Sequence, residues 1–134
     1  MKDAAELCRG LLRKAKSDRI AMEASLAAQA FDAACFHAQQ ITEKCLKAFL
    51  AYRQMEFPYT HNLTKLIEIA AGIDAVFRSL LPTVAPLTPY AVELRYDDSF
   101  WPTQQVAEEA RASALAVCLF VLDRLPPDIK KVAD

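Results

Sequence analysis

Glycine is scarce in this chain of 134 residues, which contains only Gly10 and Gly72. Many short strands would need glycine-rich turns, so the shortage argues against an all-β fold. The length suits one domain with its own core, but it is too short for two ordinary domains. We therefore expect a single all-α domain over residues 1–134, an up-and-down bundle of four to five helices.

A long apolar run is also missing. The longest one, residues 114–122, is far shorter than the roughly 20 residues that span a bilayer, and the N-terminus has no apolar signal core. We expect a cytoplasmic protein that does not enter a membrane. The formal net charge of −1 creates no global positive field, so any binding of nucleic acid has to be local.

The motifs of several enzyme classes are absent from the sequence. It contains no glycine-rich phosphate loop, no recognisable Ser or Cys nucleophile and no cluster with metal-ligand spacing. We therefore predict no metal and no cofactor, and we lean against an enzyme. The four cysteines form no Cys-x-x-Cys pair, and we expect them to be small core residues in a reducing compartment. They are Cys8, Cys35, Cys45 and Cys118.

Residues 31–54 are expected to form the central helix. Apolar and small residues recur every three or four positions from Phe31 to Tyr52, which places them on one face. The other side carries Gln40, Lys44 and Lys47 in one row. These polar side chains need either water or a ligand, so we take them as candidate ligand-binding residues.

Capping residues predict where the other helices begin. They are Asp3, either Thr60 or Asn62, Asp74, and Thr103. The helices they begin are expected to end near residue 28, at Gly72, before Pro82 and at Leu125. Four prolines between residues 82 and 102 predict an irregular link with one short helix around residues 90–94. Residues 126–134 are expected to be a frayed tail outside an ordered core of about residues 3–125.

The last helix is apolar around almost its whole circumference over residues 114–122. A surface helix of a monomer would have a polar face. We therefore expect this helix to be either central in the bundle or shared with a second subunit.

Asp18 interrupts the apolar stripe of the first helix. A buried carboxylate without a partner costs several kcal/mol. We favour a solvated position at the edge of the stripe, and the alternative is a salt bridge to Lys44 or Arg95.

Arg95 is the most informative single residue. Its guanidinium can hold a phosphate or carboxylate through two hydrogen bonds, and the neighbouring ring of Tyr96 can stack on a base. The sequence supports an alternative equally well, in which the guanidinium pairs with Glu93, Asp97 or Asp98.

Two histidines are available for proton transfer. His37 lies beside the apolar seam of the central helix, where we favour a hydrogen-bonded packing residue. His61 lies at the start of the third helix and can exchange protons near neutral pH. We nevertheless favour a structural role for His61 at the helix start.

Three segments together resemble the HEPN domain family (higher eukaryotes and prokaryotes nucleotide-binding). They are Ala34-Cys-Phe-His-Ala-Gln-Gln-Ile-Thr-Glu-Lys-Cys-Leu-Lys-Ala-Phe-Leu50, Tyr59-Thr-His-Asn-Leu63 and Glu93-Leu-Arg-Tyr96. The likeness extends from around Asp18 to the last helix. It implies a helical bundle, usually a homodimer. Such proteins are often encoded beside a minimal nucleotidyltransferase, with which they form a toxin–antitoxin-like or nucleotide-handling pair.

Many members of this family are RNases that use an arginine followed, after four to six residues, by a histidine. Counting from Arg95, those positions hold Phe100, Trp101 and Pro102, so the usual general acid–base group is absent. The resemblance then implies a homodimeric module that binds a nucleotide or RNA and acts with a nucleotidyltransferase. Its expected ligand-binding residues are Arg95, Tyr96, Asp97, Lys44, Lys47 and Gln40. The alternative is an RNase with altered catalytic residues, Arg95 for the phosphate and His61 for proton transfer.

Overall fold

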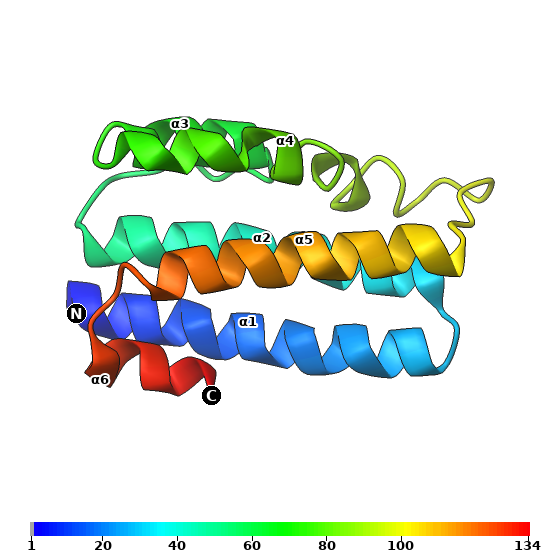
Figure 1. Cartoon of the computed structure of the whole chain (residues 1–134), viewed down its shortest axis with the longest axis horizontal. Helices are drawn as coiled ribbons and strands as arrows, with labels where there is room; N and C mark the ends of the chain where they lie inside the picture. The colour runs from blue at the N-terminus through cyan, green and yellow to red at the C-terminus, as the bar shows by residue number, and fades with distance from the viewer. Residues whose placement is uncertain (1) are drawn as a thin grey trace.

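A computed structural model describes residues 2–134, and all regular secondary structure in this part of the chain is helical, without a strand (Figure 1). This confirms the predicted all-α class. Three long helices lie side by side: α1 (Ala4–Ala27), α2 (Phe31–Tyr52) and α5 (Gln104–Leu122). A further layer packs on α2, formed by α3 (Leu63–Ala71), the 3-10 helix η1 (Ala75–Leu80) and α4 (Leu81–Val84). The remaining elements are η2 (Thr88–Tyr90), α6 (Pro127–Lys130) and η3 (Lys131–Ala133). No helix of residues 2–134 has the length and apolar character that crossing a bilayer requires.

The predicted capping residues begin their helices as expected. The Asp3 carboxylate accepts a hydrogen bond from the Glu6 amide at 2.8 Å, and the Thr103 hydroxyl accepts one from the Val106 amide at 3.2 Å. Asp74 caps η1 in the same way. Of the two candidates for α3, Asn62 is the cap, because its side chain accepts from the Lys65 amide at 3.2 Å.

Several predicted boundaries need correction. The link begins later than expected, because Pro82 does not end the preceding segment: it lies in the first turn of α4, where the missing N–H of proline is not needed. The short helix of the link is η2, which begins two residues before the expected residues 90–94 and overlaps them only at Tyr90. α5 ends at Leu122 rather than Leu125.

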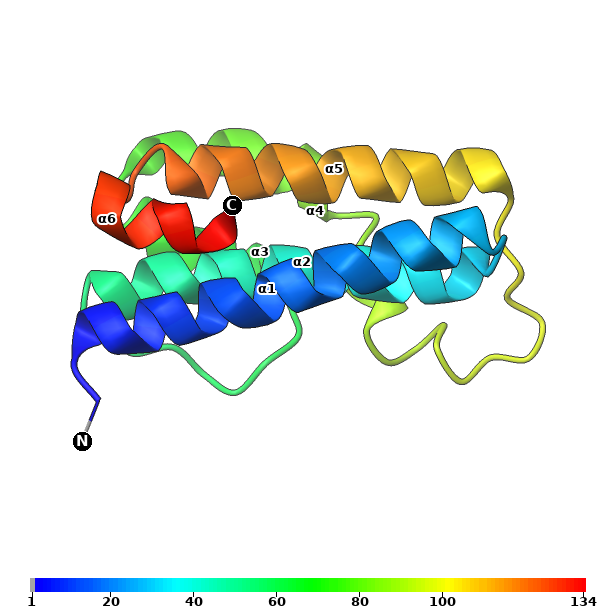
Figure 2. The same ribbon diagram turned by 90° about the horizontal axis from the view of Figure 1, so that it is seen from below.

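The last nine residues, which we expected to be a frayed tail, fold back against α1 (Figure 2). The Ile129 side chain is buried, and the Arg19 guanidinium donates to the Ala133 carbonyl at 3.2 Å. The two prolines that we expected to stop α5 instead begin a new helix, because Pro126 is the N-cap of α6 and Pro127 is its first residue. The ordered core thus extends past residue 125.

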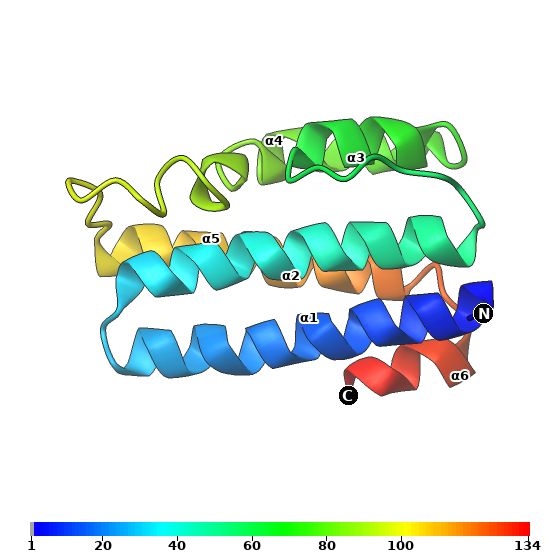
Figure 3. The same cartoon turned by 180° about the vertical axis from the view of Figure 1, so that it is seen from behind.

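α2 lies at the centre of the bundle, between α1, α5 and α3 (Figure 3). Its apolar seam is buried as predicted, and Phe49 packs on Phe77 of η1 with ring centroids 4.6 Å apart. Phe77 in turn meets Phe120 of α5 at 5.0 Å. These three rings join the layers, so the core of the protein is organised around α2.

The cysteines behave as core residues. Cys8, Cys35 and Cys45 are buried, and Cys118 is partly buried. Burial raises the pKa of Cys8 and Cys35 to about 11, which keeps both thiols protonated and unreactive at neutral pH.

The second half of α5 has an inner and an outer side. Val117 and Val121 are fully buried, whereas Leu119 is 65% exposed. α5 is therefore not enclosed within this single chain. A second subunit over its outer side stays a prediction.

Candidate functional site

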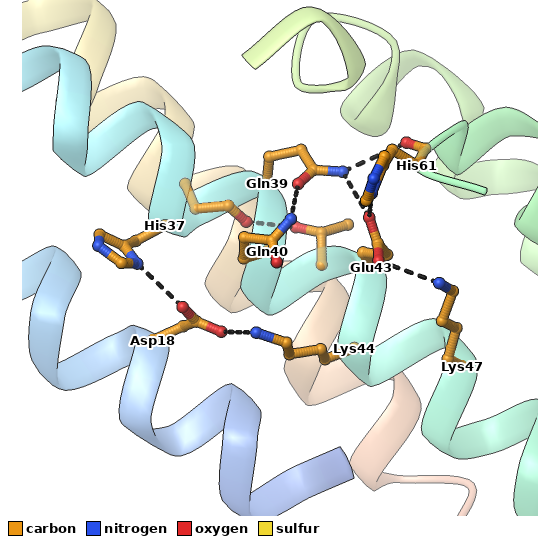
Figure 4. Close-up of polar contacts among 10 residues, drawn as sticks. Asp18, His37, Gln39, Gln40, Glu43, Lys44, Lys47 and His61 are labelled. Atoms are coloured by element: carbon orange, nitrogen blue, oxygen red, sulfur yellow. Dashed lines mark hydrogen bonds and ion pairs between the residues drawn. The ribbon is translucent and has the colours of Figure 1, made fainter. Parts of the chain in front are cut away.

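Two carboxylates, one from α1 and one from α2, each bind one histidine and one lysine beside α2 (Figure 4). Asp18 of α1 lies 2.9 Å from His37 Nδ1 through one oxygen and accepts a hydrogen bond from Lys44 Nζ through the other. We name this cluster the Asp18 triad. In the Glu43 triad, the two oxygens of Glu43 bind His61 Nδ1 at 2.7 Å and Lys47 Nζ at 3.0 Å.

The Asp18 triad corrects the solvated position that we favoured for Asp18. This residue is only 9% exposed, and the alternative salt bridge to Lys44 is the one that forms. His37 and Lys44 are seven residues apart on α2, so they stand on one face two turns apart, and α1 places the carboxylate between them. A carboxylate can only accept hydrogen bonds, so Nδ1 of His37 carries the hydrogen and Nε2 is left free.

In the Glu43 triad the carboxylate and the lysine are more deeply buried than in the Asp18 triad, whereas His61 is more exposed than His37. Gln39 donates to Glu43 Oε1 at 3.1 Å and to the His61 backbone carbonyl at 3.2 Å. Burial alone would raise the pKa of Glu43, but hydrogen bonds from His61, Gln39 and Lys47 outweigh it and lower that pKa. The Lys47 ammonium also lies 5.6 Å from the centroid of the Tyr59 ring. The triad therefore ties α2 to the segment that precedes α3.

The predicted polar row on α2 does not depend on water or a ligand. Lys44 and Lys47 are held by the two carboxylates, and Gln40 donates to the Gln39 side chain at 2.7 Å. Among residues 2–134, no buried side-chain nitrogen or oxygen lacks a hydrogen-bond partner. The pairing of Lys44 with Asp18 was one of the two alternatives that the sequence offered, and Glu43 and Lys47 pair at the four-residue spacing of one helix face. Whether these three residues also contact a ligand stays a prediction.

An open cleft of about 340 Å³ lies between the first turns of α2 and the link around residues 90–100. We call it the Arg95 cleft. Its lining residues are Asp32, Ala33, Phe36, His37, Tyr90, Leu94, Arg95 and Phe100. Three of them are aromatic, and two carry groups that can donate to an anion.

The Arg95 guanidinium lies against the Phe36 ring, with its central carbon 4.1 Å from the ring centroid, and it is 5.6 Å from the centroid of Tyr96. No ion pair found in residues 2–134 includes Arg95, so the alternative pairing with nearby carboxylates does not form in this chain. The Asp97 carboxylate instead accepts from the Ser99 amide at 2.9 Å. The Ser99 hydroxyl donates to the same oxygen at 2.6 Å, and these two hydrogen bonds lower the pKa of Asp97.

His37, for which we expected a hydrogen-bonded packing role, lines the Arg95 cleft. Its ring meets the edge of the same Phe36 ring, with centroids 5.1 Å apart, so Phe36 has the guanidinium on its face and the imidazole beside it. His61, which the sequence analysis preferred as a partner of Arg95, does not line this cleft. The interruption of the α1 stripe by Asp18 was the available signal, because a buried carboxylate needs a partner such as a histidine.

The bundle and its polar triads define a compact α-helical domain, and comparison with known families assigns it. The model of the HEPN domain family matches residues 8–125, so the chain belongs to this family. Membership supports a nucleotide- or RNA-related module. Searches of curated proteins and of solved structures gave no match. In residues 2–134, no three His, Cys, Asp or Glu side chains are grouped to hold a metal ion.

Proposed function

We propose that the protein is a homodimeric HEPN module that binds a nucleotide or RNA at the Arg95 cleft and acts with a minimal nucleotidyltransferase, in a toxin–antitoxin-like pair. One observation supports the binding site: Arg95 is exposed, its guanidinium has no carboxylate partner in the described residues, and it lines an open cleft. Its N–H groups remain available for a phosphate.

The aromatic lining of the cleft favours a ligand with a flat ring. Tyr90 and Phe100 stack on each other with ring centroids 5.6 Å apart, and both line the cleft. Tyr96 lies beside Arg95 and is 77% exposed, which leaves its ring open to a base. Arginine side chains and aromatic rings together commonly bind nucleotides and single-stranded RNA.

The arrangement within one chain favours binding over RNA cleavage. Phe36, which contacts Arg95, and Glu43, which holds His61, are seven residues apart on α2, or about 10 Å along the helix axis. An RNase built from Arg95 and His61 would therefore need the histidine of a second subunit. Binding needs only the residues that already meet in the cleft.

The binding site is tested by calorimetric titration of the full chain with the four 5′-ribonucleoside monophosphates and with a short oligoribonucleotide. Arg95→Ala should weaken binding by about tenfold or more, since it removes a charge-assisted contact. Arg53→Ala is the matched control, because Arg53 is also exposed and lies over an aromatic ring, that of Phe49 at 5.9 Å, but not in this cleft. Equal affinities for the two variants would contradict the proposed site.

The proposed partnership needs a separate experiment. The genes flanking the coding sequence are sequenced, and any minimal nucleotidyltransferase found there is co-expressed with this protein. Size-exclusion chromatography with light scattering then gives the mass of each species. Co-elution at the mass of a mixed complex supports the pair. A homodimer that elutes without the nucleotidyltransferase contradicts it.

A further inference from the structure

We infer that His37, and not His61, is the second anion-binding group of the Arg95 cleft, and that the cleft takes the phosphate monoester of a single nucleotide. This inference rests on the proposed function and specifies the ligand of the same site.

The imidazole of His37 is held in place through its Nδ1 atom. Asp18 binds its Nδ1 at 2.9 Å, and Lys44 holds the other oxygen of that carboxylate, so the carboxylate itself cannot easily turn. Figure 4 shows the ring of His37 with its second nitrogen directed away from Asp18. Because His37 lines the cleft and Nδ1 is occupied, Nε2 is the atom left to meet a ligand.

Arg95 and His37 both contact the ring of Phe36 and both line the same cleft, so one anion in the cleft is within the reach that we assign to both. The guanidinium fork supplies two parallel N–H groups, and a protonated imidazole supplies a third. A phosphate monoester presents three terminal oxygens, which matches this number of donors. A diester inside an RNA chain has only two, and its chain must leave the site in both directions.

The dimensions of the cleft also favour one nucleotide. Its volume of about 340 Å³ lies near the lower end of small-molecule sites, which span roughly 300–1,000 Å³. The stacked Tyr90–Phe100 pair provides an aromatic wall for a base. Asp32 in the first turn of α2 repels a phosphate placed beside it, but it can accept from the hydroxyl groups of a ribose. A nucleotide therefore fits this lining better than inorganic phosphate.

The Glu43 triad supplies an internal control. His61 has the same hydrogen-bonding pattern as His37, with Nδ1 on a carboxylate that also binds a lysine, but it lies outside the cleft. A loss of affinity that arises only because a buried carboxylate has lost its histidine would appear in both His37→Gln and His61→Gln. A loss caused by a missing ligand contact would appear in the first variant alone.

The test is calorimetric titration of the full chain with 5′-AMP and with its phosphate methyl ester. We expect wild type to bind 5′-AMP about tenfold or more tightly than the ester. We expect His37→Gln to weaken 5′-AMP binding by about tenfold or more, and His61→Gln to leave it within about twofold. Nitrogen NMR of the wild-type histidines, which requires no substitution, should show 5′-AMP shifting the Nε2 signal of His37 but not that of His61.

The outcomes separate this inference from the proposed function. If wild type binds 5′-AMP and Arg95→Ala abolishes binding, but His37→Gln binds like wild type, the site stands and the role of His37 is overturned. Equal affinity for 5′-AMP and its methyl ester overturns the preference for a monoester. If wild type binds no nucleotide and no RNA, the proposed site fails together with the inference.

Discussion

Replacing Lys47 with alanine tests whether the Glu43 triad stabilises the fold. The Lys47 side chain is only 11% exposed, and its ammonium binds Glu43 Oε2 at 3.0 Å. Removing one partner of a buried ion pair costs about 3–5 kcal/mol, because a buried charge is left uncompensated. Glu43 keeps His61 and Gln39 as donors, so we expect the lower end, about 3 kcal/mol.

Urea unfolding followed by circular dichroism measures this loss. For a small protein, about 3 kcal/mol corresponds to a fall of roughly 1–3 M in the midpoint at an unchanged slope. All variants are compared at one protein concentration, because a dimer would make the midpoint depend on it. Arg78→Ala is the control: it also removes one cation, but the Arg78–Glu68 pair is about half exposed and should be worth at most about 1 kcal/mol. If Lys47→Ala lowers the midpoint no more than Arg78→Ala, our account of the triad is refuted.

Two further predictions concern the core and acid stability. Phe49→Ala should cost about 3–5 kcal/mol in the same urea assay, because it leaves a cavity against Phe77, whereas Val92→Ala on the exposed link should stay within about 0.5 kcal/mol. Equal losses for the two would mean that α2 is oriented differently. The pKa of Glu43 lies below its usual 4.5 in the folded protein, so the stability it provides is present above that pH and is lost as the pH falls through the folded value. Melting temperatures between pH 3 and 7 should therefore converge for wild type and Glu43→Gln at the acid end, and a constant difference across this range would count against the assignment.

Local sequence signals predicted most of the fold. The caps Asp3, Asn62, Asp74 and Thr103 act over two or three residues, so their effect can be foreseen from the sequence. The apolar seam of α2 could also be predicted, because its residues recur with the period of a helix. The order of the last nine residues could not be predicted, because a segment this short is ordered by its contacts with α1 rather than by its own propensity.

The candidate site was foreseen only in part. Arg95 and Tyr96 are adjacent in sequence and could be identified together, whereas Phe36, the ring nearest the guanidinium, comes from a distant helix. The spacing of Glu43 and Lys47, four residues apart, was also a usable sign of an ion pair on one face. The pairing of Asp18 with His37 joins two helices at a crossing whose register the sequence does not reveal. A histidine on the edge of an apolar seam therefore looked like a packing residue, although it lines the cleft.

The deep burial of α2 has a consequence for the two sides of the Arg95 cleft. One side consists of the first turns of α2, whose amides from Cys35 onward are hydrogen-bonded within a helix that is buried over most of its length, and these amide hydrogens should exchange with solvent mainly when the whole domain unfolds. The other side includes residues 91–100, most of them exposed, and their amides should exchange through local opening at a small fraction of that free energy. A ligand would then meet a fixed surface that carries His37 and an adaptable one that carries Arg95, and its binding should slow exchange mainly in the link.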